Sequence, residues 1–313
     1  MAIKDRPDVI KSKPKKPSGD YKKFAIQKYP GDISKFFFGG GAKKDPIITK
    51  DTKIVSIGSC FAENVARYLK AHKYRYISTE KGSGYFSANW GIVFNSASIR
   101  QIFEYSFGLF HPKVSWWERE KGRMQDPYRR NIIYPKGVHD KKRNAHYEAS
   151  RKALENAEVI IATLGLVEVW RDKRDGATFW RVPPMHLYNP KIYEFYVMNN
   201  RDVWNDLSRM KQIIDEFNPN CHLIFTVSPV PFQATYREDV DSVTANVYSK
   251  AVSSTAAIEF CSSYNGRGVH YFPSFEFVRY GFGNPYIADG RHVKRPVINT
   301  MMQFFEKMFV KGK

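Results

Sequence analysis

A glycine–serine–cysteine sequence near the start of the chain combines two nucleophilic residue types at one turn. Gly58, Ser59 and Cys60 follow an apolar run at residues 53–57 and open a segment with helical spacing. The N-terminus of a helix offers free backbone N–H groups and the positive end of the helix dipole, which favour a thiolate or an acyl oxyanion. Gly58 permits the tight turn. These residues predict a nucleophile at Cys60 or Ser59; the alternative is a cysteine that only packs under its helix.

A second chemical pair lies close to the other end of the chain. Asp289 precedes His292 by three residues, directly before the last segment with helical spacing. At this separation the carboxylate can accept a hydrogen bond from Nδ1–H of the imidazole, which leaves Nε2 free to take a proton from a nucleophile. The pair predicts a general base that is oriented by an aspartate.

The composition of the chain indicates the cellular compartment and the kind of partner to expect. Its 313 residues include 50 Lys and Arg against 31 Asp and Glu, a net charge of +19, and only three cysteines. Few cysteines and no apolar leader or membrane-length run predict a cytoplasmic protein without a membrane span. A basic surface favours a polyanionic partner. Eight Lys or Arg and three prolines within the first 23 residues predict a flexible tail, which we place at residues 1–45.

The remaining chain alternates strand-like runs with segments of helical spacing, which predicts an α/β fold with a mostly parallel sheet. The expected strands are 53–57, 74–78, 158–163, 222–227 and 269–272, and the expected helices are 61–72, 96–107, 144–156, 202–217, 243–263 and 293–309. Two stretches, 109–143 and 170–200, interrupt this order and predict long loops or small subdomains beside a binding site. We expect one domain over residues 46–313.

Five sequence blocks together resemble those of a known family. They are Gly58–Ala62, Thr163–Trp170, Thr226–Pro231, Tyr248–Lys250 and Tyr271–Ser274. On these blocks the chain is identified as a member of the GSCFA family, which resembles the SGNH (GDSL-like) hydrolases and their polysaccharide-acyl esterase relatives. The resemblance covers residues from about 50 to 313. It implies a flavodoxin-like three-layer α/β/α sandwich, with the nucleophile after the first strand and an Asp-x-x-His pair near the end.

The resemblance also implies roles for individual residues. SGNH enzymes have Gly-Asp-Ser at the turn after the first strand, so Cys60 stands at the nucleophile and Ser59 at the aspartate. A Gly from a second block and an Asn from a third complete the oxyanion hole in that superfamily. Here Gly91 and Asn95 are the candidates from the second block. The third block begins at Gly165 and places Val167 at the asparagine position, where the side chain cannot donate a hydrogen bond.

Three further residues have competing interpretations. Glu168 could act in catalysis, or it could be a structural carboxylate that caps a loop or pairs with Arg171. Ser249 and Lys250 are sequence neighbours, and neighbours on a helix do not face each other, so we do not expect a Ser/Lys dyad. The eight histidines lack metal-ligand spacing, so no metal site is expected.

The function expected from these residues is acyl transfer, by an O-acyl esterase or O-acyltransferase acting on an acylated carbohydrate or a similar acyl acceptor. Cys60 would be the nucleophile, His292 the base and Asp289 its orienting group. No cofactor is required, although a transferase would use an acyl donor such as acetyl-CoA. The alternative is a catalytically silent module of the same fold that binds a polyanionic glycan or a nucleic acid. The sequence does not indicate an oligomeric state.

Overall fold

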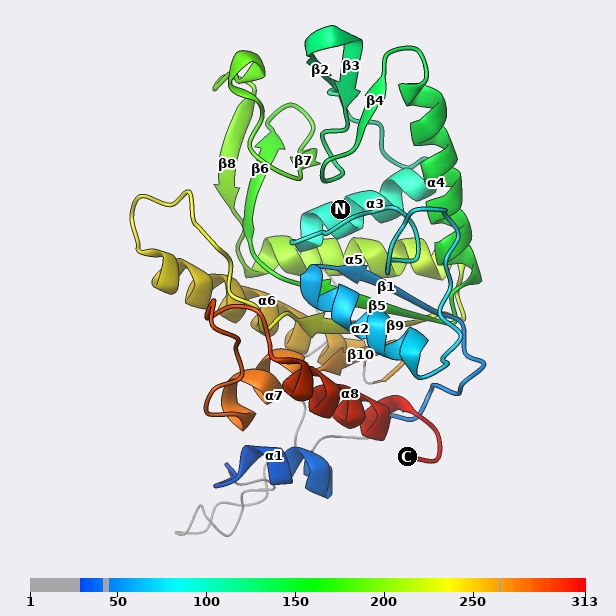
Figure 1. The fold of residues 1–313 in the computed structure, drawn as a ribbon, viewed down its shortest axis with the longest axis vertical. Helices are drawn as coiled ribbons and strands as arrows, with labels where there is room; N and C mark the ends of the chain where they lie inside the picture. Colours follow the sequence, from blue (N-terminus) through cyan, green and yellow to red (C-terminus); the bar gives the residue numbers. More distant parts are fainter. Residues whose placement is uncertain (1–28, 42–44, 265) are drawn as a thin grey trace.

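Four parallel strands form the central sheet of the protein. The computed structural model describes residues 29–41, 45–264 and 266–313. The strands stand in the order β1 (Ile54–Gly58), β5 (Val159–Leu164), β9 (His222–Val227) and β10 (Val269–Phe272) (Figure 1). Beyond β1, a single parallel bridge joins Ile54 to Tyr76. With Tyr76 counted as the second strand position, the order is 2-1-3-4-5, which is that of flavodoxin-like folds.

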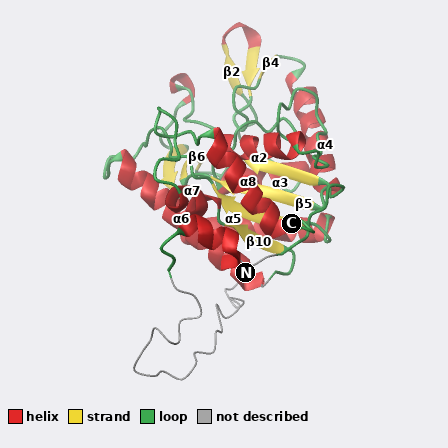
Figure 2. Ribbon diagram, turned by 60° about the horizontal axis from the view of Figure 1, so that its bottom comes forward, coloured by secondary structure: helices red, strands yellow, loops and turns green. Residues whose placement is uncertain are grey.

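Helices cover both faces of this sheet, so the protein is a three-layer α/β/α sandwich (Figures 1 and 2). Alternate strand residues point to opposite sides: Val55 and Ile57 belong to one core cluster, and Ile54 to the other. The first core is closed by α3 (Ser96–Ser106), α4 (His139–Asn156), α5 (Asn200–Phe217) and α6 (Ser242–Tyr264). The second is closed by α2 (Cys60–Ala71), α7 (Ser274–Gly281) and α8 (Arg295–Phe309). The expected fold class is confirmed.

The two stretches that interrupt the α/β order each contain a small antiparallel sheet. The first consists of β2 (Trp117–Arg119), β3 (Arg123–Gln125) and β4 (Ile133–Pro135), with η3 (Glu120–Gly122) between the first two strands. The second has the order β7 (Thr178–Phe179), β6 (Glu168–Asp172) and β8 (Tyr193–Val197), with η4 (Met185–Leu187) before β8. Trp117 and Phe179 share an aromatic core between these sheets, with ring centroids 5.3 Å apart. The prediction of small subdomains is therefore confirmed.

The predicted elements differ from the observed ones at two places in the α/β part. Residues 74–78 do not form a strand, because only Tyr76 completes a bridge to the edge strand β1. The sequence also gave no sign of α7, a short helix that begins directly after the Pro273 that ends β10. The other expected strands and helices are present, with boundaries within a few residues of those predicted.

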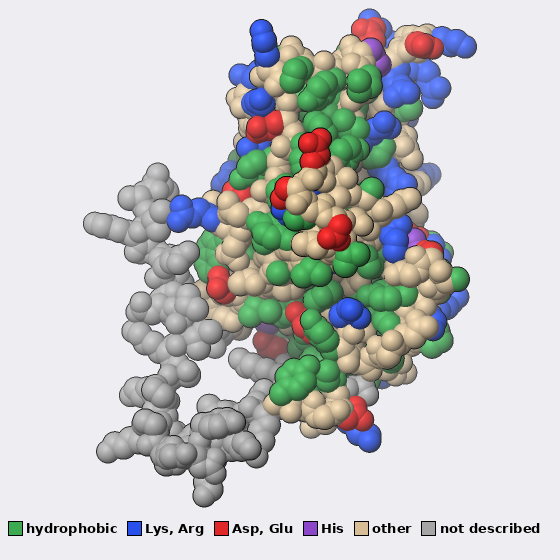
Figure 3. All heavy atoms as spheres, turned by 90° about the vertical axis from the view of Figure 1, so that its left-hand side faces the viewer, with side chains coloured by type: hydrophobic (Ala, Val, Ile, Leu, Met, Phe, Trp, Pro, Cys, Tyr) green, Lys and Arg blue, Asp and Glu red, His purple; other side chains and the backbone are tan. Residues whose placement is uncertain are grey.

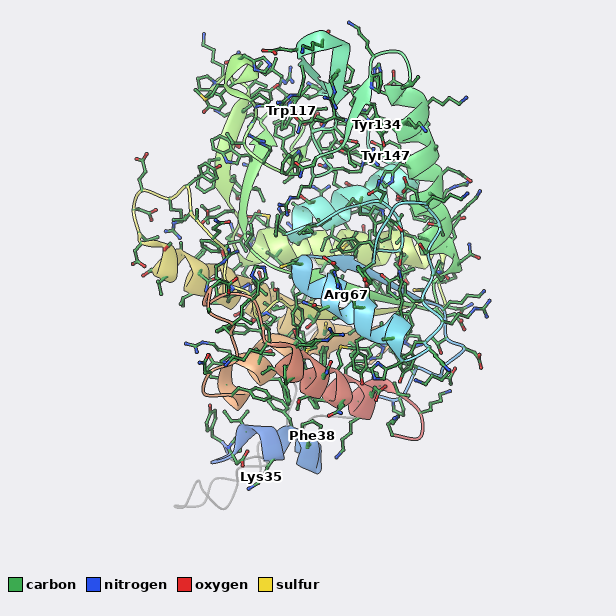
Figure 4. The ribbon with its side chains drawn as sticks, viewed as in Figure 1. Lys35, Phe38, Arg67, Trp117, Tyr134 and Tyr147 are labelled. Atoms are coloured by element: carbon green, nitrogen blue, oxygen red, sulfur yellow. The ribbon has the colours of Figure 1, made fainter. Side chains whose placement is uncertain are left out.

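The segment before the domain packs partly against it. Residues 1–28 and 42–44 of the predicted tail lie outside the described residues. Within the rest of that range, α1 (Ile33–Phe36) and η2 (Phe37–Gly41) lie beneath α7 and α8, as Figure 4 shows for Phe38. The ring centroid of Phe37 is 5.6 Å from that of Phe277 and 4.9 Å from that of Phe304. This part of the range is a packed segment of the fold and not a free tail.

Candidate active site at the carboxyl ends of the strands

Cys60 is the first residue of α2, immediately beyond the end of β1. Ser59 is the N-cap: its hydroxyl oxygen accepts a hydrogen bond from the Phe61 N–H at 3.2 Å, and its side chain is buried. Because Ser59 is engaged in capping, its oxygen is poorly placed to attack a substrate. Cys60 is partly exposed, whereas Cys221 and Cys261 are buried. The arrangement therefore favours Cys60 over Ser59 as the nucleophile.

Several groups around Cys60 act on its ionisation in opposite directions. Burial raises the pKa of the thiol above its usual value, and the carboxylate of Glu63 adds to this increase. The positive charge of Arg291 and the backbone N–H groups of Phe61 and Cys60 lower it. The net direction is upward, so burial outweighs the helix N-terminus, which lowers the pKa of this thiol as the sequence analysis expects. A base is needed to remove its proton.

Backbone hydrogen bonds join the turn at Cys60 to the other segments with predicted site residues. The Val93 N–H donates to the Gly58 carbonyl at 2.8 Å, and the N–H groups of Gly165 and Leu166 both donate to Phe94 O at 2.9 Å. Gly165 is required for this close approach, because a Cβ there would lie 2.6 Å from Phe94 O. The chain segments around Gly58, Gly91 and Gly165 therefore meet at one edge of the sheet.

The candidates for the oxyanion hole have distinct local roles. Gly91 has a φ of +70° and lies two residues before Val93, in the loop that passes the turn at Cys60. Asn95 is the N-cap of α3, and its Oδ1 accepts from the Ser98 N–H at 2.8 Å. Its amide NH2 has no hydrogen-bond partner among the residues that the structure describes. Val167 is fully buried and packs in the core.

Glu168 has the structural role that the sequence left open. One carboxylate oxygen accepts from the Thr235 hydroxyl at 2.7 Å, and the other accepts from the Tyr236 N–H at 3.3 Å. Arg171 pairs instead with Glu194, with 2.7 Å between Nε and Oε1. Glu168 therefore caps the loop that follows β9, and the suggested pairing with Arg171 is wrong.

The Asp289–His292 pair has the geometry that its spacing predicted. Asp289 Oδ2 lies 2.5 Å from His292 Nδ1, and Oδ1 accepts from the backbone N–H groups of Arg291 and His292. The hydrogen bond to His292, with these two N–H groups, lowers the pKa of Asp289 to about 2. The carboxylate is thus ionised at neutral pH and holds the imidazole with Nε2 outward. The side chain of His292 is about half exposed, at 49%.

Contacts with the segment after β9 bring this pair to the same edge of the sheet as Cys60. Tyr286 donates its hydroxyl hydrogen to Pro229 O at 3.0 Å, and Arg291 Nε donates to Pro231 O at 3.1 Å. β9 lies next to β5, and β5 next to β1, so their carboxyl ends open onto one edge. The charge of Arg291 acts on Cys60. In the described part of the chain, no hydrogen bond joins the Cys60 thiol to His292.

Lys250, which the sequence analysis considered only as a partner of Ser249, contacts a site segment in a way that the sequence did not predict. It lies on α6, is 3% exposed, and donates from Nζ to the Gly165 carbonyl at 2.7 Å. The hydroxyl oxygen of its neighbour Ser249 accepts a hydrogen bond from the Val167 N–H at 3.4 Å. The signal that could have found Lys250 is a lysine within the buried stripe of a helix.

A model of the GSCFA family matches residues 53–305, which are more than three quarters of the chain. The chain belongs to the GSCFA family. The match spans every site segment described above, from β1 to the Asp289–His292 pair and most of α8. The family membership expected from the sequence blocks is thereby confirmed.

Comparisons with individual proteins add little to this membership. One solved structure, described as a "putative GDSL-like lipase" from Parabacteroides merdae, is 15% identical to this GSCFA protein and has a TM-score of 0.35. The similarity covers 85% of this chain and 98% of that one. No curated protein is similar enough to count as a match. Among the described residues, no helix has both the length and the apolar character to span a membrane.

Proposed function

We propose that this GSCFA protein is an acyl-transfer enzyme with Cys60 as nucleophile, His292 as general acid–base and Asp289 as orienting group. The observation that carries the proposal is the meeting of two features at one sheet edge. One is a partly exposed cysteine at a helix N-terminus, and the other is a half-exposed histidine held by an ionised aspartate. A nucleophile, a base and a group that orients the base are the components that acyl transfer requires.

In the proposed reaction, Nε2 of His292 takes the Sγ proton as sulfur attacks the acyl carbonyl carbon. The carbonyl oxygen becomes negative and is stabilised by the backbone N–H groups of Cys60 and Gly91, with the NH2 of Asn95 as a further donor. Collapse of this intermediate breaks the bond to the leaving group, which takes the proton from His292. The product of this half-reaction is a thioester on Cys60.

The second half-reaction returns Cys60 to its thiol form. A hydroxyl group, from water in an esterase or from a sugar in a transferase, loses its proton to His292 and attacks the thioester carbonyl. The sulfur leaves and regains the proton from His292. The exposure of the imidazole supports access by a bulky hydroxyl acceptor, so we propose a carbohydrate or similar acceptor. In the transferase, a thioester such as acetyl-CoA would serve as the donor.

Replacement of Cys60 with alanine tests this function. Wild-type protein, given an activated acyl ester with and without a neutral oligosaccharide, is expected to release acid or to form acylated sugar. In Cys60→Ala the rate is expected to fall by about a thousandfold or more, because the covalent route is removed. The matched control is Cys221→Ala, which removes a buried thiol directly before β9 and should retain the activity. Full activity of Cys60→Ala would refute the proposal.

A second candidate function is a catalytically silent module that binds a polyanion. The observations that favour it are the net charge of +19, the buried Val167 at the donor position and the raised pKa of Cys60. On the face in Figure 3, however, Lys and Arg side chains are scattered among apolar and polar ones and do not form one continuous patch. Binding to an anionic polymer that weakens steeply with salt, without any acyl transfer, would favour this function.

A further inference from the structure

A buried lysine without an acidic partner lies at the centre of the site. Lys250 is 3% exposed, and its Nζ donates a hydrogen bond to the Gly165 carbonyl at 2.7 Å. No carboxylate forms an ion pair with it among the residues that the structure describes. Burial of an ammonium group without a counter-charge costs desolvation free energy. A neutral side chain could make the same hydrogen bond between α6 and the segment after β5 at a lower cost.

The sheet register places the Gly165 carbonyl, to which Lys250 is bound, on the chain next to the one that leads to Cys60. Gly58 on β1 pairs with Thr163 on β5, so the two chains leave the sheet side by side. Cys60 follows Gly58 by two residues, and Gly165 follows Thr163 by two residues. Lys250 Nζ is hydrogen-bonded to the carbonyl of Gly165. It therefore approaches from α6, on the face of the sheet opposite to α2.

Burial and the charge of Cys60 act on the pKa of Lys250 in opposite directions. Burial lowers the pKa of Lys250 to about 7, and the negative charge of the Cys60 thiolate opposes this decrease. On Cys60 itself, the charged groups that act are Arg291, from the loop before α8, and Glu63 on α2. Arg291 is bound to Pro231 O near the protein surface. Lys250 is thus a cation inside the protein that can lose its proton near neutral pH.

We propose that the Lys250 ammonium is the buried counter-charge of the Cys60 thiolate. This inference rests on the proposed function and assigns Lys250 as a positioning residue that acts through Cys60. When the S–H bond of Cys60 breaks, the proton goes to His292 Nε2 during catalysis, or to solvent when no substrate is bound. Lys250 keeps its three N–H bonds, and the resulting +1 and −1 charges stabilise each other.

Alkylation of Cys60 as a function of pH tests the pair without a substrate. Iodoacetamide labelling of the full chain, followed by peptide mass spectrometry, reports the thiolate population. Below about pH 7, where Lys250 keeps its proton, wild type is expected to be labelled about tenfold faster than Lys250→Met, equivalent to a difference of about one unit in the pKa of Cys60. Above that pH Lys250 loses its proton, and the two labelling rates should converge.

The controls separate this charge effect from loss of structure. Ser249→Ala removes the neighbouring hydroxyl on α6 and should keep the wild-type labelling profile. Should Lys250→Met fold poorly, NMR of ¹⁵N-labelled lysine gives a second measurement. The pKa of Lys250 should be lower in Cys60→Ala than in wild type, because the thiolate that supports the ammonium is absent.

Two results would overturn the inference: a labelling profile that is the same in wild type and folded Lys250→Met, or a Lys250 pKa that does not change in Cys60→Ala. Acyl transfer by wild type is measured on the same preparations. Activity with an unchanged labelling profile would refute only the role of Lys250. A labelling profile that depends on Lys250 in a protein without acyl transfer would support the pair and refute the proposed function.

Discussion

Replacement of His292 with alanine is expected to lower kcat/KM for acyl transfer by about a thousandfold. Burial raises the pKa of the Cys60 thiol, so the attack depends on a base that takes its proton. Loss of the imidazole removes that base and also the acid that protonates the leaving group. The measurement is the initial rate with an activated acyl ester, and the control is His111→Ala, which removes an exposed histidine before β2.

Asp289→Asn tests the orienting role within the same prediction. The pKa of Asp289 is about 2, so its carboxylate is ionised above about pH 4 and holds Nδ1–H of His292 throughout that range. An asparagine can donate to Nδ1 and so favour the wrong tautomer. The rate is expected to fall by about a hundredfold or more. Unchanged rates in both His292→Ala and Asp289→Asn would contradict the assigned roles.

The second large effect concerns stability at the turn before the nucleophile. Gly58 has a φ of +143°, and a Cβ at this position would lie 2.5 Å from Thr163 O. Gly58→Ala therefore combines backbone strain with a steric clash between β1 and β5. We expect the free energy of unfolding to fall by about 2 to 5 kcal/mol. Urea denaturation followed by circular dichroism measures this change.

Gly283→Ala is the matched control, because a Cβ there would meet no atom within 4 Å. Its free energy of unfolding should remain within about 0.5 kcal/mol of wild type. If Gly58→Ala were as stable as Gly283→Ala, the described turn between β1 and α2 would be wrong.

The central sheet could be predicted from the sequence because its strands are buried on both faces. The run Val159–Leu164 is continuously apolar apart from one threonine, and it became β5 within one residue of its predicted start. Tyr74 to Ser78 failed as a strand because an edge segment has only one neighbour, and alternation alone does not show how many bridges form. α7 has only eight residues and lies between prolines and turns, so the sequence shows too short a helical period to predict it.

The candidate site could be predicted where its chemistry is local. Asp289 and His292 are three residues apart, so their hydrogen bond follows from one turn of the chain. The contact of Lys250 with Gly165 joins residues 85 positions apart, and only the packing of α6 on the sheet creates it. The pKa of Cys60 also depends on long-range burial, which outweighs the local effect of the helix N-terminus.

The central claim is that an acyl group passes through Cys60. The most direct measurement is rapid acid quenching of wild-type protein with an activated acyl ester, followed by peptide mass spectrometry of the segment that contains Ser59 and Cys60. We predict one acyl group on the Cys60 sulfur, removable by neutral hydroxylamine as a thioester is, and none in Cys60→Ala. An acyl group on Ser59, or the same modification of Cys60→Ala, would contradict the account.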